Sequence, residues 1–432
     1  MKKGFLVSLF LVFTLIVSAC SSNTSTNEGG EKTSEGGGDK TAALDIFSWW
    51  TGAGEEDGLK ALIALFEEKH PEIPIENAAV AGGAGTNAKA VLASRMQGDD
   101  PPATFQVHGG AELNEGWVAA GKMETLNDFY EAEGLLDKFP QDLIDMVSNK
   151  DGSIYSVPVN IHRGNVLWYN KKVFEENGVE APTTFDEFFE VADVLKEKGI
   201  TPLALGDKEP WTASHLYETV LLGVLGAEDY GKLWTGEVAF DDPKVVEAAE
   251  TFKKMLSYIN EDHSSRNWQD ATQLVANGEA AMNIMGDWAK GYLVNDLKLK
   301  VNEDFGYIAT PGTDGQFMVI TDTFGLPKGV DNPEGVKQFL SVLASVEGQD
   351  AFNPLKGSIP ARVDSDVSKY DQYGQDTIED FKSAELAASL AHGSAAPEGF
   401  VTKMNQNINI FVTQQDVDQF TESLTSAASE LN

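Results

Sequence analysis

The sequence has little cysteine and few basic residues, and both shortages limit what the protein can be. Cys20 is the single cysteine among 432 residues, so no disulfide forms within the chain. Lysine and arginine number 32 against 68 aspartates and glutamates, which gives a formal net charge of −36. A surface of this sign repels the phosphates of nucleic acids and anionic lipids. We therefore expect a soluble protein without a nucleic-acid partner.

Motifs that mark common enzyme classes and metal sites are also missing. The sequence contains no nucleophile elbow, no HExxH motif and no metal-ligand spacing among its six histidines. The glycine-rich stretch 82–87 lacks the spacing of a phosphate-binding loop, and we interpret it as a plain connection from a strand to a helix. These absences favour a protein that is not an enzyme and that uses neither a metal nor a cofactor.

The longest apolar run lies at the N-terminus. Two lysines precede an apolar stretch that ends at Ala19, and such a short run ending in small residues is typical of a secretory signal peptide over 1–19. Its last residues, Val17–Cys20, resemble the bacterial lipobox, which implies cleavage before Cys20 and lipidation of its sulfur. The rest of 20–40 is rich in Ser, Gly, Thr and Glu, which predicts a flexible tether.

Strands and helices alternate after the tether. We predict strands over 42–49, 73–80 and 104–108, separated by helices whose apolar residues recur at helical spacing. Alternation of this kind predicts an α/β fold with a mostly parallel sheet. Because roughly 390 residues are long for one hydrophobic core, we expect two lobes.

Three later segments carry specific local signals. Thr184 and Glu187 have the spacing of a capping box at the start of a helix. Asp322 lies inside the apolar strand pattern 317–326, where aspartate is uncommon, so we predict a cleft or crossing position, with a bulge or a cap as the alternative. Residues 356–362 are predicted to form a loop between helices.

The ends of the first and third predicted strands carry side chains suited to a polar ligand. Trp49 and Trp50 end the first strand, and Gln106 and His108 share one side of the third. Ligands of open α/β sheets bind at the carboxyl ends of the strands, so we expect these groups to converge. Because neighbouring strand residues face opposite sides, at least one indole is predicted to face a ligand. The alternatives are two core tryptophans and an ordinary solvated strand end.

The motifs together resemble a known family. SWW at 48–50, YNKKVFEENG at 169–178, GEAAMNIMGDWA at 278–289 and KGSIPAR at 356–362 resemble the bacterial extracellular solute-binding proteins of ABC sugar importers, family 1, in particular the glucose-type monosaccharide-binding subgroup. The resemblance covers 42–432 and implies the two-lobe periplasmic-binding-protein fold of type II, which closes on its solute about a hinge.

The resemblance also implies a division of the chain and a function. The N-terminal lobe would comprise 41–160 plus 289–322, and the C-terminal lobe 161–288 plus 323–432. A monomer anchored by lipid at the extracellular face of the cytoplasmic membrane would bind glucose or a close epimer and deliver it to a membrane permease. Two alternatives remain open, namely binding of an oligosaccharide or another small polar solute and, more remotely, a secreted glycosidase.

The sugar contacts of the subgroup map onto aromatic and polar residues of both lobes. Indole faces cover the C–H faces of a pyranose, and carboxylate, amide, ammonium and imidazole groups bond its hydroxyls. For three of these residues an ordinary helical or solvated role is the alternative, namely Trp268, Lys356 and His392. The implied set is Trp49, Trp50, Glu55, Gln106, His108, Trp211, Trp268, Trp288, Asp322, Lys356 and His392.

Overall fold

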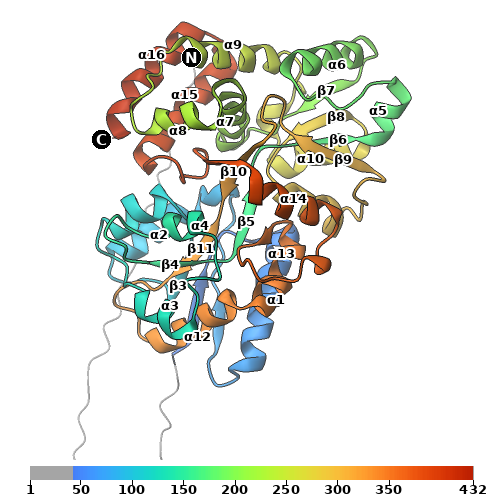
Figure 1. The fold of residues 1–432 in the computed structure, drawn as a ribbon. Coiled ribbons are helices and arrows are strands. Elements are labelled where there is room, and N and C mark those ends of the chain that lie inside the picture. The colour runs from blue at the N-terminus through green and yellow to red at the C-terminus, as the bar shows by residue number, and fades with distance from the viewer. Residues whose placement is uncertain (1–41, 432) are drawn as a thin grey trace, which may run out of the picture. The chain divides into compact units, whose positions relative to one another are not determined.

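A computed structural model of the protein describes residues 42–431. The predicted signal peptide, the lipidation site at Cys20 and the tether lie outside the described residues. Within 42–431, none of the helices has both the length and the apolar character needed to cross a bilayer. The described chain forms three β-sheets with helices packed around them (Figure 1).

The first sheet has the strand order β2-β1-β3-β11-β4. Its first three strands are parallel, as predicted, and β11 runs antiparallel to both of its neighbours, β3 and β4. The strands are β1 Leu44–Phe47, β2 Ile75–Asn77, β3 Thr104–His108, β4 Ser156–Pro158 and β11 Asp322–Gly325. The helices around it are α1 Ala53–Lys69, α2 Ala88–Gln97, α3 Asn127–Glu133, α4 Gln141–Met146, α12 Pro333–Ala344 and α13 Val346–Lys356. Buried side chains of these elements make one hydrophobic cluster, the first core.

A second sheet with its own helices forms the second core. Its strand order is β7-β8-β6-β9. The strands are β6 Val166–Asn170, β7 Thr201–Ala204, β8 Ala280–Ile284 and β9 Phe305–Ala309. The helices are α5 Lys171–Asn177, α6 Phe185–Glu197, α7 Trp211–Leu225, α8 Ala227–Trp234, α9 Pro243–Leu256, α10 Trp268–Asn277, α15 Glu398–Gln414 and α16 Val417–Ala427. The predicted capping box of Thr184 and Glu187 is present at the start of α6.

A third sheet connects the two cores. Its strands β5 Asn160–Arg163 and β10 Gln316–Ile320 run between them (Figure 1). The predicted single strand over 317–326 is divided at Thr321, because the chain leaves β10 and enters β11 of the first sheet there. Asp322 therefore lies at a crossing, as predicted. The outer strands are β12 Ile359–Pro360, inside the predicted loop, and β13 Glu385–Ala388, and α14 Gln372–Ser383 lies between these two in the chain.

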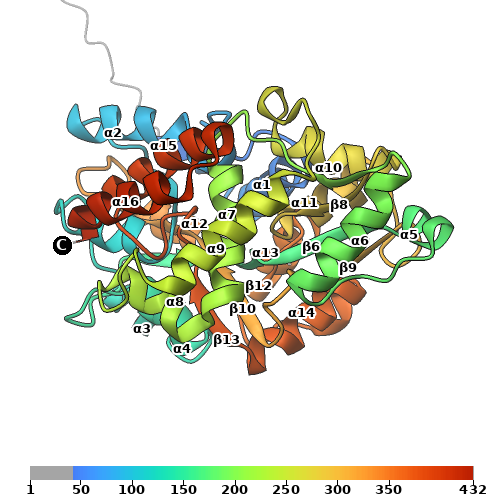
Figure 2. The ribbon, with the colours of Figure 1, turned by 90° about the horizontal axis from the view of Figure 1, so that it is seen from above.

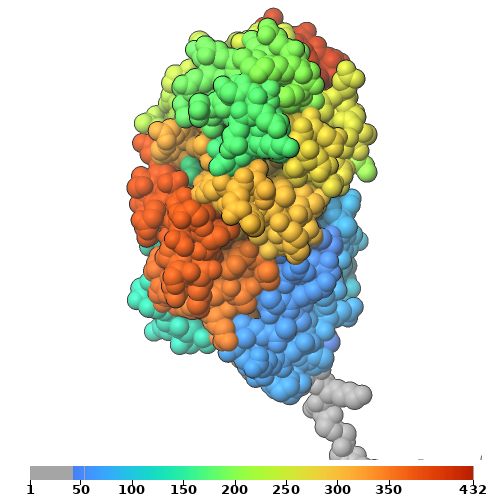
Figure 3. Space-filling model, turned by 90° about the vertical axis from the view of Figure 1, so that its right-hand side faces the viewer, coloured from blue at the N-terminus to red at the C-terminus, as the bar shows by residue number. Residues whose placement is uncertain are grey.

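The structure corrects the predicted lobe boundaries in two segments. β9 lies in the part assigned to the N-terminal lobe, yet it pairs along its whole length with β6 of the second sheet. α12 and α13 were assigned to the C-terminal lobe, yet their apolar side chains belong to the first core and α13 packs on α1. The segment around 290–310 also lies against the N-terminal part of the first core on the face shown in Figure 3. Long-range pairing, which local patterns do not encode, decides these assignments.

Candidate functional site

A cavity of about 30 Å³ lies where both cores meet the crossing strands. Nine of the eleven predicted site residues line it, and Trp50 and Gln106 do not. The lining also contains residues that sequence reasoning missed. The full lining is Trp49, Glu55, Gly83, Ala84, His108, His162, Trp211, Trp268, Trp288, Ile320, Asp322, Lys356 and His392.

The two adjacent tryptophans have different environments. β1 ends at Phe47, so both indoles follow the strand instead of alternating across it. Trp49 lines the cavity, with its ring centroid 5.0 Å from that of His108. Trp50 is fully buried, and its ring lies 5.5 Å from Phe324 and 4.7 Å from Phe352. The structure thus makes Trp50 a residue of the first core, which corrects its predicted place at the ligand.

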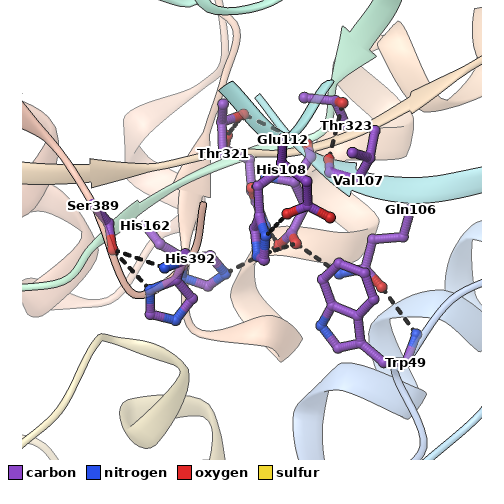
Figure 4. A network of polar contacts seen from close by, with 12 residues as sticks. Trp49, Gln106, Val107, His108, Glu112, His162, Thr321, Thr323, Ser389 and His392 are labelled. Atoms are coloured by element: carbon purple, nitrogen blue, oxygen red, sulfur yellow. Dashed lines mark hydrogen bonds and ion pairs between the residues drawn. The ribbon is translucent and has the colours of Figure 1, made fainter. Parts of the chain in front are cut away.

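Gln106 is also buried away from the cavity. Its Oε1 accepts a hydrogen bond from the backbone N–H of Trp49 at 3.1 Å, and its Nε2 donates to Oδ1 of Asp322 at 2.6 Å (Figure 4). Both polar ends of the amide are therefore occupied by protein groups. Gln106 fixes the positions of two cavity residues, and its direct contact with the ligand stays a prediction.

Asp322 is the centre of a buried polar network. Besides the bond from Gln106, its Oδ2 accepts a hydrogen bond from Nδ2 of Asn160 at 2.7 Å and lies 3.5 Å from Nε2 of His162. Burial by itself would raise the pKa of Asp322, but the nearby imidazole of His162 and the charge of Lys356 outweigh it and hold this pKa well below its usual range. The cavity therefore contains a fixed negative charge.

A chain of charged groups leads from the cavity to α2. Nδ1 of His108 lies 2.8 Å from Glu112, and the same carboxylate oxygen lies 3.1 Å from Nζ of Lys89 (Figure 4 shows the first pair). Burial favours a raised pKa at Glu112, but the positive charges of Lys89 and His108 lower it. On the other side, Lys356 is buried at the end of α13 and its Nζ lies 2.6 Å from Glu55.

Tryptophans of a third hydrophobic cluster, which lies beside the second sheet, form an aromatic wall. The ring of Trp288 lies 4.9 Å from that of His392 and 6.2 Å from that of Trp211, while Trp268 at the start of α10 completes the wall. Oγ of Ser389 lies 2.8 Å from Nδ1 of His392. These positions agree with the predicted cleft, although a role in ligand binding stays a prediction for each residue.

Two buried polar atoms of cavity residues have no hydrogen-bond partner among the described residues. They are Nε1 of Trp288 and Nε2 of His162. The other ring nitrogen of His162 pairs with Asp287. Buried polar groups are rarely left unpaired, so we predict that these two atoms form hydrogen bonds with ligand hydroxyls. Sequence reasoning missed His162, although its two-residue spacing from Asn160 places both on one face of a crossing strand.

Comparisons with known proteins identify the family. The model of the bacterial extracellular solute-binding proteins matches residues 52–350. An uncharacterized ABC transporter extracellular-binding protein of Pyrococcus horikoshii is 39% identical over 99% of this chain and 96% of its own length. The chain belongs to this family.

Two further matches support the assignment of this chain to the solute-binding protein family. A probable sugar-binding periplasmic protein of Rhizobium meliloti is 33% identical over 82% of this chain and 85% of its own. The crystal structure of the bacterial solute receptor AcbH, with the stated preference for β-D-galactopyranose, superposes with a TM-score of 0.80, at 21% identity, over 90% of this chain and 97% of that one. The latter shows the two-lobe fold.

One group of the solute-binding protein has the residue types of a metal site. His215, Glu218 and His392 place their ligand atoms within 4.8 Å of one another. However, the two ring nitrogens of His215 already lie 3.0 Å from Glu218 and 3.0 Å from the carbonyl oxygen of Gly164. Glu218 also accepts hydrogen bonds from the backbone N–H groups of 390 and 391. A metal would have to displace these bonds, and the arrangement fits a hydrogen-bonded support for His392 better.

Acid is expected to destabilise the solute-binding protein through His392. Burial, together with the charges of His108 and His215, holds the pKa of His392 well below its usual value. Below pH 6.5 the unfolded chain therefore binds a proton that the native state does not, and stability should fall by about 1 kcal/mol per pH unit between pH 6 and 5. The pKa of His162 is raised despite burial because Asp287 is close, so protonation of His162 adds stability as the pH falls towards 6 and opposes the effect of His392.

Urea unfolding at pH 7, 6 and 5 measures this dependence. His392→Gln should remove about 1 kcal/mol per pH unit of acid destabilisation between pH 6 and 5, while it leaves an uncharged polar side chain next to Ser389. An equal slope in the variant and the unaltered protein would contradict the role of His392.

Proposed function

We propose that this protein is the sugar-binding component of an ABC importer, and that it binds one monosaccharide, glucose or a close epimer. The observation that carries the proposal is the combination of four tryptophans with buried charged groups and two unpartnered polar atoms around one cavity. The name of the Rhizobium meliloti relative, a probable sugar-binding periplasmic protein, supports the same class of ligand.

The chemistry of the lining matches a pyranose. Trp49 from the first core and the wall of Trp211, Trp268 and Trp288 offer apolar faces to sugar C–H groups. Asp322, Lys356 and the imidazoles offer charge-assisted hydrogen bonds to the ring hydroxyls, which are about twice as strong as neutral ones. A buried site of this kind rejects an analogue that lacks a hydroxyl, because a polar group of the protein then stays unpaired.

The size of the cavity bears on the mechanism. A volume of about 30 Å³ holds one or two waters, so a sugar enters only when the two cores move apart. Closure on the ring then requires that the sugar bind the closed state more tightly than the open state. We propose that the closed form docks on a permease, and that lipid on Cys20 holds the monomeric protein at the extracellular face of the membrane.

A panel of sugars tests this function. We expect glucose or an epimer, at 100 times its Kd, to stabilise the protein by about 2.7 kcal/mol and to raise its melting temperature by several degrees. Tryptophan fluorescence should change with the same sugar. Responses to oligosaccharides alone would contradict the monosaccharide assignment, and hydrolysis of a chromogenic glycoside would favour the glycosidase alternative.

A further inference from the structure

The glycine-rich segment 82–87 is part of the cavity wall, although its sequence suggested a plain connection. It follows β2 of the first sheet and leads into α2, so its two ends are attached to the first sheet and its helices. Gly83 and Ala84 line the cavity beside Trp211 of the second core. This segment, which we name the glycine loop, therefore covers the ligand position next to Trp211 of the aromatic wall.

One carboxylate oxygen joins the glycine loop to the second core. Oε2 of Glu209 accepts a hydrogen bond from the backbone N–H of Gly83 at 3.2 Å and another from Nε1 of Trp211 at 3.1 Å. Glu209 is half-buried, precedes α7 and does not line the cavity. It thus contacts two lining residues, one from each core, without being placed to touch the solute.

The backbone of the glycine loop lies close to Glu209 and Trp211. A Cβ atom on Gly83 would lie 2.8 Å from Oε2 of Glu209 and 2.9 Å from Nε1 of Trp211, so a side chain there would displace at least one of these groups. Ala84 has φ of +48°, a left-handed conformation that is unfavourable for alanine. Such backbone strain persists only where surrounding contacts impose it, and the Glu209 bond is a contact of this kind.

We propose that Glu209 is a positioning residue that latches the closed state by holding the glycine loop and Trp211 together over the ligand. The identity of the ligand rests on the proposed function, whereas the latch rests on the contacts of Glu209 alone. Because opening separates the cores and breaks the bond to Gly83, the bond favours closure. Its loss lowers the fraction of closed protein and weakens the apparent affinity by the same factor.

A distance measurement without any sugar tests the latch directly. α2 and α15 overlap when seen from above (Figure 2), and residues of both line one groove, so their separation reports on opening. Spin labels on Val91→Cys and Ile410→Cys, which replace side chains 41% and 46% exposed, serve as probes in the full chain with Cys20→Ser. We expect Glu209→Ala to reduce the short-distance population at least twofold by pulsed electron resonance.

Binding measurements provide the second test. With the sugar that gives the largest thermal shift, Glu209→Ala should weaken affinity about five- to twentyfold, mainly through faster dissociation, as expected for one charge-assisted bond at a half-buried site. Glu209→Gln keeps an acceptor oxygen, so its affinity should lie between those of the unaltered protein and Glu209→Ala. Gly83→Ala should weaken binding at least as much, because its methyl group collides with the latch. The control is Glu228→Ala, which removes an exposed carboxylate of α8 that pairs with Lys232.

The outcomes separate the two proposals. Unaltered protein that binds no sugar, with a distance distribution that shifts in Glu209→Ala, overturns the sugar assignment and supports the latch. A Glu209→Ala distribution that coincides with that of the unaltered protein overturns the latch, as does an affinity within twofold. The urea midpoint of unliganded Glu209→Ala should fall by less than the loss in binding free energy, because the open native state stays folded without the latch. A drop equal to the loss in binding free energy would show a merely structural role.

Discussion

Asp322→Asn is expected to lower sugar affinity at least 100-fold and to destabilise the fold by about 3 kcal/mol. The carboxylate accepts hydrogen bonds from both Gln106 and Asn160, and it lies in a fully buried network with His162. An asparagine offers one acceptor oxygen, so at least one buried donor loses its partner and the facing imidazole loses its negative charge. Breaking such buried charged contacts typically costs about 3–5 kcal/mol.

Asp314→Asn is the matched control for this substitution. Asp314 is exposed in the turn before β10, so its change should stay within about 0.5 kcal/mol. Urea unfolding gives the stability of both variants, and titration calorimetry gives their affinities. If Asp322→Asn bound sugar within fivefold of the unaltered protein, Asp322 would have no central role in the site.

Trp49→Ala is expected mainly to weaken sugar binding and Trp50→Ala mainly to destabilise the fold, although the two residues are neighbours. Trp49 lines the cavity, so its removal should weaken sugar binding about 30- to 150-fold, which corresponds to about 2–3 kcal/mol of stacking and apolar contact. Trp50 packs on Phe324 and Phe352 in the first core, so its removal should cost about 3–5 kcal/mol of stability.

Each tryptophan variant is the other's control. Calorimetry is carried out at a temperature where both variants remain folded, and unfolding curves are recorded with the same samples. The folded fraction of Trp50→Ala should bind sugar within about threefold of the unaltered protein. A large loss of affinity in Trp50→Ala with unchanged stability would show that Trp50, and not Trp49, contacts the sugar.

The sequence predicted those features that depend on short stretches of chain. The three parallel strands of the first sheet and the capping box at Thr184 are present because apolar spacing and cap residues act over a few positions. The crossing at Asp322 was predicted from one polar residue in an apolar strand. The family was predicted from four motifs and is shown by the comparison over 52–350.

Only the tertiary structure decided how the site is built. Gln106 and Asp322, which are 216 positions apart, bond to each other, and Gln106 thereby positions a carboxylate that lines the cavity. Pairing of β9 with β6 decided the lobe of that segment, and Phe352 on α13 decided that Trp50 belongs to the core. The bond between Glu209 and Gly83 spans 126 positions and joins two cores. Hydrogen bonds and packing between such distant residues depend on how the elements are assembled, which no local pattern of the chain encodes.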